Sequence, residues 1–171
     1  MEATRIFDLP KRQLEKFPNL PMFVSKQNGE WKSMNTQTFL DRVNEISKGL
    51  IAIGVQPGEK VGLISENRVE WNMIDYAIQQ VGAVVVAIYP NISDNDYEYI
   101  FKDSSIKVCF TSNLDLYTRL DLLKTKLPSL EQLYSIDEFK NTNSWNEVIK
   151  KGQEIDIIKV ENRSAEVKYE D

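Results

Sequence analysis

Two short apolar runs separated by a helical pattern constrain the fold of this chain most. The runs are Lys60–Ser65 and Val84–Tyr89. Between them, apolar residues recur at the spacing of an α-helix. They are Trp71, Ile74, Ala77, Ile78 and Val81. A strand, a helix and a second strand form a βαβ unit, whose strands are parallel and whose crossover is right-handed. Because Val84–Tyr89 is continuously apolar, we expect it to be buried on both faces of the sheet.

The helix of this unit has signals at both ends. Asn67 is expected to cap its start, and Glu70, three residues later, is placed to reach back to the amide of the cap. Gly82 follows the last apolar position, where a left-handed residue usually ends a helix. Gly54 and Pro57–Gly58 mark a turn before the first strand.

The first part of the chain predicts a short helix and a hairpin. The helix spans Pro10–Lys16. The dipeptide Asn28–Gly29 separates two short segments, Pro21–Val24 and Glu30–Ser33, and this arrangement is typical of a β-hairpin. We expect Trp31 to pack on one face of that ribbon.

A long helix is expected between the hairpin and the βαβ unit. Asn35 or Thr36 can cap its start, and Gly54 ends it. Its apolar residues step by four, three, four and three, which gives one stripe on the helix surface. These residues are Phe39, Val43, Ile46, Leu50 and Ile53.

Helices and strands continue to alternate after the βαβ unit. A helix capped by Ser93 and Asp96 is expected first, followed by a strand at Lys107–Thr111. The next helix starts at Ser112 or Asn113 and ends at Pro128, and a strand follows at Gln132–Ile136. The last expected helix is capped by Ser144 and Glu147 and ends at Gly152. Val167 and Tyr169 could begin another strand.

This alternation predicts an α/β fold with a mainly parallel sheet flanked by helices on both faces, preceded by a short N-terminal β-hairpin. We expect two units. Residues 1–34 form the N-terminal helix and hairpin, and residues 35–171 form an α/β subdomain.

Composition excludes several kinds of function. The 21 basic and 26 acidic residues give a net charge of -5, which argues against nucleic-acid binding. The chain has no histidine, so Ser-His-Asp and Cys-His catalysis and most zinc sites are excluded. The single cysteine, Cys109, lies in an apolar run and is expected to be buried and inert. We see no secretory signal and no transmembrane segment, and we expect a cytoplasmic protein.

Several polar segments are candidates for a site, and each has a structural explanation. Gly54, Gly58 and Gly62 are spaced four residues apart and are interpreted as turn glycines, because they do not match the motif of a phosphate-binding loop. Glu66–Arg68 follows a strand, where ligands dock, but capping and an ion pair also explain it. Tyr89–Asn91 could line a pocket or simply end a strand.

The acidic pairs Asp94/Asp96 and Asp137/Glu138 are expected at helix starts, where negative charge suits the helix dipole. They lack the glycine spacing of a metal loop. We expect Trp145 to fasten its helix to the domain surface. From these residues we assign no catalytic, cofactor-binding or metal-ligating residue.

Several blocks of the chain carry a resemblance to a known family. They are Gly49–Val61, Ile64–Trp71, Gly82–Asn91, Tyr97–Ile100, Asp103–Ser104 and Lys107–Val108. Together they resemble the N-terminal part of AMP-forming acyl-CoA synthetases, and most closely that of long-chain fatty acid–CoA ligases. The resemblance runs from about Trp31 to Phe110 and more loosely beyond.

The resemblance implies activation of a fatty acid with ATP and Mg²⁺ to an acyl-adenylate, followed by transfer to coenzyme A. The family's phosphate loop, rich in Thr, Ser and Gly and ending in Pro-Lys-Gly, is not in this chain, nor are its later motifs. No catalytic or nucleotide-binding residue can therefore be carried over. Gly82–Pro90 is the segment that the resemblance places nearest the acyl pocket.

Three hypotheses follow. The first is an N-terminal fragment of a fatty acid–CoA ligase, inactive alone, whose partners are the remainder of its own enzyme chain and the fatty acid. The second is a fragment of another adenylate-forming enzyme, of aryl, amino-acid or luciferase-like type. The third is a non-catalytic α/β binding module. A fragment should leave an open sheet edge, or cover that edge as a homodimer.

Overall fold

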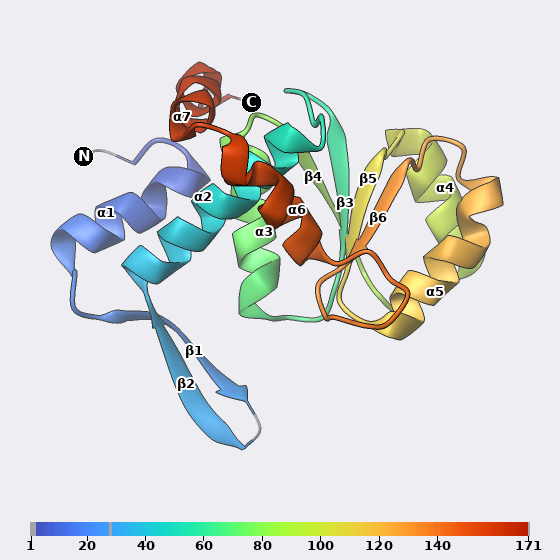
Figure 1. Cartoon of the computed structure of the whole chain (residues 1–171), viewed down its shortest axis with the longest axis horizontal. Coiled ribbons are helices and arrows are strands. Elements are labelled where there is room, and N and C mark those ends of the chain that lie inside the picture. The colour runs from blue at the N-terminus through green and yellow to red at the C-terminus, as the bar shows by residue number, and fades with distance from the viewer. Residues whose placement is uncertain (1–2, 28, 171) are drawn as a thin grey trace.

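The computed structural model describes residues 3–27 and 29–170 and contains two sheets (Figure 1). The larger sheet has four strands in the order β4-β3-β5-β6. Their bounds are β3 Lys60–Ile64, β4 Val84–Ile88, β5 Val108–Thr111 and β6 Gln132–Ser135. Every neighbouring pair is parallel. The βαβ unit and the parallel α/β fold are therefore confirmed.

Helices cover both faces of this sheet, each over its own apolar core (Figure 1). One face carries α2 (Thr36–Ala52), α3 (Val69–Gln80) and α6 (Trp145–Lys151). The other carries α4 (Asp94–Ser104) and α5 (Leu114–Leu123). Side chains alternate along a strand, so β5 sends Phe110 into the first core and Cys109 into the second.

The N-terminal part forms a short helix and a hairpin that projects from the body (Figure 1). Its elements are η1 (Ile6–Asp8), α1 (Leu9–Lys16), β1 (Pro21–Gln27) and β2 (Glu30–Asn35). Asn28 of the predicted turn lies outside the described residues, and Gly29 has a φ of 86°. The predicted hairpin is confirmed.

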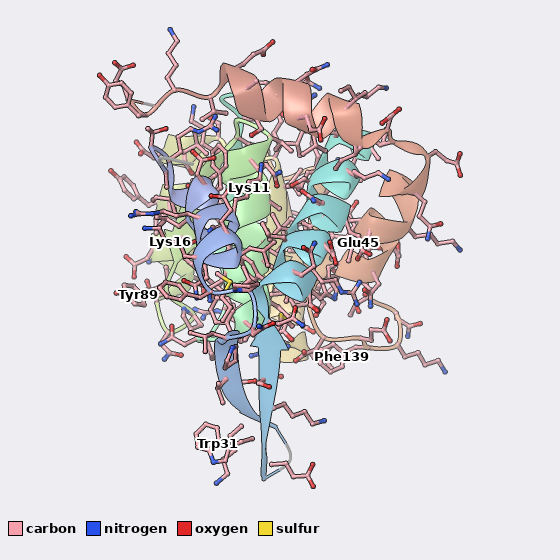
Figure 2. All side chains as sticks on the ribbon, turned by 90° about the vertical axis from the view of Figure 1, so that its left-hand side faces the viewer. Lys11, Lys16, Trp31, Glu45, Tyr89 and Phe139 are labelled. Carbon is pink, nitrogen blue, oxygen red and sulfur yellow. The ribbon has the colours of Figure 1, made fainter. Side chains whose placement is uncertain are left out.

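The expectation that Trp31 packs on the hairpin is wrong. Its side chain is 72% exposed and points away from the ribbon in Figure 2. The ribbon has two strands, and no described helix or strand covers the tip at which Trp31 stands. A lone ribbon cannot bury a large ring without a second layer.

The helix caps follow the sequence except at α3. Asn35, not Thr36, accepts from the amide of Thr38 at the start of α2. Of the two alternatives at α5, Asn113 is the cap. The capping boxes of Ser93 with Asp96 and of Ser144 with Glu147 are both present.

The prediction that Asn67 caps α3 is wrong. The N-cap is Arg68, whose side chain makes no capping hydrogen bond, and Asn67 precedes it by one residue. The carboxylate of Glu70 accepts from Arg68 Nε at 2.9 Å and does not bind the amide of a cap. At the other end of this helix, Gly82 has the expected positive φ of 77°.

The chain after β6 contains a helix that the sequence pattern does not reveal. The short helix η2 (Lys124–Lys126) lies before β6, and η3 (Gly152–Glu154) follows α6. Helix α7 then spans Ile157–Glu166 and is capped by Asp156. Val160 and Ser164 are the buried residues of α7. The strand suggested at Val167 and Tyr169 is wrong, because neither residue lies in a strand.

The expectation that β4 is buried on both faces is also wrong. This strand is at the edge of the sheet, and Val84 is 47% exposed. Val85 and Val86 are half-buried, Ala87 is exposed, and only Ile88 is buried. The continuous apolar run thus lies where no described segment covers its outer side.

Candidate functional site

Polar side chains meet at the carboxyl ends of β3 and β5, the end at which α/β sheets usually bind ligands. Glu66 follows β3, and Ser112 and Asn113 follow β5. The carboxylate of Glu66 accepts from Ser112 Oγ and from Asn113 Nδ2, the second at 2.9 Å. The hydrogen bond from Ser112 lowers the pKa of Glu66, which favours its ionised form.

Arg68 extends this polar group to β6. Its Nε lies 2.9 Å from a carboxylate oxygen of Glu70, and one of its terminal nitrogens lies 2.9 Å from Asp137. A longer hydrogen bond of 3.5 Å reaches the carbonyl of Ser112. Partial burial opposes the charge of Arg68, but the bonds to Glu70 and Asp137 raise its pKa overall. Arg68 therefore joins the ends of three strands as a permanent cation.

We call Glu66, Arg68, Ser112, Asn113 and Asp137 the carboxyl-end cluster. The ion pair expected in the Glu66–Arg68 segment is present, and the capping role of Asn67 is not. The sequence predicts only a helix-capping role for Ser112 and Asn113. Their position directly after β5, equivalent to that of Glu66 after β3, is the signal that could have linked them. Whether the cluster touches a ligand stays a prediction.

The Tyr89–Asn91 turn is held by the second core. The hydroxyl of Tyr97 donates toward the carbonyls of Pro90 at 3.0 Å and of Tyr89 at 3.3 Å. The Tyr89 ring is 83% exposed and lies at the surface in Figure 2. The backbone of the turn therefore ends the strand, and Tyr89 is not among the residues that line the cavity at the amino end of β4, described below.

The acidic pairs differ from expectation in one case. Asp94 and Asp96 do lie in the first turn of α4, where Asp94 pairs with Arg119 at 2.6 Å. Asp137 and Glu138 do not start a helix, because they follow β6 in a loop. Asp137 pairs with Arg68 there, and Glu138 accepts from Asn146 at 2.7 Å.

Two buried residues behave as expected. Cys109 is fully buried, and burial raises the pKa of its thiol, so it is an inert core residue. Trp145 packs against the first core and fastens α6 to it.

A cavity lies at the opposite, amino end of β4. Its volume is about 750 Å³, and it is bounded by the N-terminal segment, the start of β4 and the end of α7. Gly82, Ala83, Val84 and Val85 line it, together with Arg163. The first residues of Gly82–Pro90 thus border a cavity, and the assignment of this segment to an acyl pocket stays a prediction.

Comparison with known families decides what kind of protein carries this fold. Residues 10–168 match the model of a family described as AMP-binding enzyme. The chain belongs to the AMP-binding enzyme family. The resemblance found in the sequence is confirmed at this level.

Two curated relatives of this chain are named as ligases of long-chain fatty acids. The long-chain-fatty-acid–CoA ligase FadD15 of Mycobacterium bovis is 27% identical over 154 residues, which cover 90% of this chain and 26% of the relative. The ligase heimdall of Drosophila melanogaster is 25% identical over 130 residues, or 74% of this chain and 19% of the relative. The chain thus spans about a quarter or less of the length of these relatives.

Solved structures of two CoA ligases share this fold. A long-chain-fatty-acid-CoA ligase (FadD1) of Archaeoglobus fulgidus superposes with a TM-score of 0.75 at 24% identity, over 86% of this chain and 30% of that one. The anthranilate CoA ligase AuaEII, in complex with anthranoyl-AMP, gives a TM-score of 0.74 at 24% identity, over 84% and 26% of the two chains. At these identities the likeness concerns the fold and not the acid.

The structure also bears on membrane insertion. Among the described residues, no helix combines the length and the apolar character needed to span a bilayer.

Proposed function

We propose that this chain is the N-terminal part of a long-chain fatty acid–CoA ligase and that it is inactive alone. The family match over residues 10–168 supports the enzyme class. The relatives that share most of this chain are fatty acid–CoA ligases, and each extends far beyond it.

The observation that carries the proposal is a difference between the two edges of the sheet. The β6 edge is covered by its own chain. Ser135 donates its amide to the carbonyl of Asn143 at 2.8 Å, and Asn143 Nδ2 donates to the carbonyl of Leu133 at 3.3 Å. These contacts occupy the outward amide of Ser135 and the outward carbonyl of Leu133, and covering such groups is how proteins protect a sheet edge.

For the outer edge of β4, no backbone contact of this kind is found among the described residues. Val84 donates its amide inward to Glu59 at 2.8 Å. Backbone groups alternate in direction along a strand, so those of Val85 and Ala87 point to the outer edge. No strand lies there within residues 3–27 and 29–170. We therefore infer that further strands of the ligase extend the sheet from β4.

In the parent enzyme the reaction has two steps. The carboxylate of the fatty acid attacks the α-phosphate of ATP, which gives acyl-adenylate and diphosphate. The thiol of coenzyme A then attacks the acyl carbonyl, which gives acyl-CoA and AMP. The described residues do not suit the metal of this reaction. Glu66 and Asp137 are taken by Ser112, Asn113 and Arg68, and no group of three metal-ligating side chains exists in the described part. We place ATP, Mg²⁺ and coenzyme A on the remainder of the parent.

An activity assay tests the inactivity. The purified chain is incubated with ATP, Mg²⁺, coenzyme A and palmitate, and AMP and palmitoyl-CoA are measured, with circular dichroism as the control for folding. We expect no product above a protein-free blank. Palmitoyl-CoA formed in proportion to the protein would overturn the claim that the chain is inactive alone.

The sequence of the source gene beyond Asp171 tests the enzyme class. We expect a Thr/Ser/Gly-rich loop that ends in Pro-Lys-Gly within a short distance. A stop codon directly after Asp171 would replace the ligase with the third hypothesis, a non-catalytic binding module. Acid profiling of the parent separates a fatty acid ligase from an aryl ligase, the class of the AuaEII structure. The cytoplasmic location also remains a proposal.

A further inference from the structure

A second hollow lies between helix α1 and the start of strand β1, which the loop 17–20 connects (Figure 1). Its volume is about 500 Å³, which is within the usual range of small-molecule sites. We call this hollow the α1 groove. Its lining includes Leu9, Arg12, Lys16, Phe17, Pro21 and Met22.

The α1 groove is built by the N-terminal part of the chain alone. All of its lining residues lie between Leu9 and Met22. The last described residues line the cavity at the amino end of β4, and the two hollows share no lining residue. Strands added at β4 would extend the sheet, whereas the groove lies outside the sheet, beside a helix that packs on α2.

The apolar side chains of the groove are only partly buried. Leu9 is 48% exposed and Phe17 is 49% exposed. Met22 is partly buried and packs against the first core, so the floor of the groove is fixed to the body of the protein. Large apolar side chains that gather around a hollow indicate a place for a ligand or a partner.

Two cations line the same groove. Arg12 and Lys16 are four residues apart on α1, so they project from the same face of the helix. Within the described part of the chain neither forms an ion pair, unlike Arg5, which is paired with Asp8. Glu15, the acidic residue of α1, does not line the groove. The groove therefore combines positive charge with apolar surface.

This combination suits a ligand with an anionic head and an apolar tail. The guanidinium of Arg12 offers parallel N–H groups that match the two oxygens of a carboxylate, and Lys16 adds a second charged donor. An alkyl chain gains free energy with every methylene that it removes from water, so a long tail should bind more tightly than a short one.

We propose that the α1 groove binds a free fatty acid, with its carboxylate on Arg12 and Lys16 and its alkyl chain on the apolar side chains of the groove. The binding itself does not depend on the proposed ligase. Its use does, because the groove would hold the class of acid that the ligase consumes. ATP, Mg²⁺ and coenzyme A are placed on the remainder of the parent, so the groove holds the acid and does not activate it.

Titration of the ¹⁵N-labelled chain with dodecanoate, followed by NMR, tests the site. The fatty acid is kept at concentrations at which it forms no micelles. We expect saturable shifts of backbone amides in residues 9–22. Hexanoate should bind about tenfold more weakly or worse, because its tail buries less apolar surface. Dodecanol should also bind about tenfold more weakly, because it lacks the charge that Arg12 and Lys16 bind.

Single substitutions test the two cations. Arg12→Gln and Lys16→Gln should each weaken the binding of dodecanoate by about tenfold, because each removes a charged hydrogen bond to the carboxylate. Lys11→Gln is the matched control, since Lys11 also stands on α1 (Figure 2) but does not line the groove. This control should bind dodecanoate as the unchanged chain does. Circular dichroism checks that each variant is folded.

Three outcomes would overturn the proposal. The first is an equal loss of binding in Lys11→Gln and Lys16→Gln, which would indicate unspecific attraction to positive charge. The second is amide shifts at Val84 and Val85, in the other cavity, without shifts in residues 9–22. The third is adsorption of the chain to vesicles that contain phosphatidylglycerol without saturable binding of dodecanoate. Each would leave the proposed ligase intact, because the activity assay and the gene sequence test that proposal separately.

Discussion

The guanidinium of Arg5 donates a hydrogen bond to the backbone carbonyl of Val167, 3.0 Å away and 162 residues later in the chain. A second bond reaches the carbonyl of Ser164 in α7. The last carbonyls of a helix have no partner within it, and a cation suits the negative end of the helix dipole. Arg5 thus caps α7 from the opposite end of the sequence. Asp8 and the ring of Phe7, whose centroid is 4.5 Å away, hold the guanidinium in place.

Arg5→Ala should detach α7. We expect a loss of about 1–3 kcal/mol in the free energy of unfolding, because charged hydrogen bonds to partly buried groups are lost. Urea denaturation measures this loss, and hydrogen exchange should show faster exchange confined to α7. Arg42→Ala is the control, since Arg42 forms an exposed ion pair with Glu45 and should change stability by roughly 0.5 kcal/mol or less. Equal effects of the two substitutions would contradict the capping role.

Asp8 should make the stability of the protein depend on pH in the acidic range. Burial raises its pKa, but the bonds from Arg5 outweigh burial, and the net pKa lies below the ordinary value of 3.8. A carboxyl whose pKa is lower in the folded state stabilises the protein above its unfolded pKa, and this contribution is lost as pH falls through the folded pKa. Stability should therefore decline below about pH 4, and Asp8→Asn should flatten this decline. Urea midpoints between pH 3 and 7 measure both curves, and parallel curves would contradict the prediction.

Asp75 should have the opposite effect. Burial raises its pKa above 3.8, and its carboxylate accepts from Gln79 at 2.9 Å. A carboxyl with a raised folded pKa contributes stability below its unfolded pKa and loses it as pH rises through the folded pKa. Asp75→Asn should therefore stabilise the chain at pH 7, by roughly 1 kcal/mol. The gain should vanish at low pH, where Asp75 is protonated. Thermal unfolding at both pH values checks this, and a loss of stability at pH 7 would refute it.

Gly49→Ala should disrupt the contact between α2 and α6. A Cβ atom at Gly49 would lie 2.5 Å from the carbonyl oxygen of Val148, and one at Gly152 would lie 2.5 Å from the amide nitrogen of Gly49. Because the backbone cannot move aside as a side chain can, we expect Gly49→Ala to lower the free energy of unfolding by about 2 kcal/mol or more. Gly54→Ala separates a clash from backbone strain, since Gly54 has a φ of 93° and open space around it. Gly54→Ala should lower the free energy of unfolding by about 1–2 kcal/mol. Chemical denaturation ranks the two variants, and a harmless Gly49→Ala would show that α6 can shift.

Local rules account for the elements that the sequence predicted well. Ser93 and Asp96, or Ser144 and Glu147, need only each other to start a helix, so their roles are visible in the sequence. Apolar stripes likewise identified the long helix that carries Phe39 and Leu50.

The predictions that were wrong or absent concern contacts between residues that are distant in sequence. An apolar run such as Val84–Ile88 predicts a strand, but its place at the sheet edge depends on where the other strands settle. Helix α7 is short, buries few residues and is held by Arg5, which no local pattern reveals. The carboxyl-end cluster joins Glu66 to Ser112 across 46 positions for the same reason.

The strand order has a consequence for the sequence of events on the ribosome. The first strand of the sheet to be made, β3, occupies an inner position, and β4 and β5 then add to its two sides. Strand β6 then pairs with β5. Each strand after β3 therefore pairs with a strand that has already been synthesised, so the sheet can grow outward during synthesis. Arg5 is different. Its partner Val167 is made 162 residues later, so the N-terminal segment is fastened only after α7 has emerged.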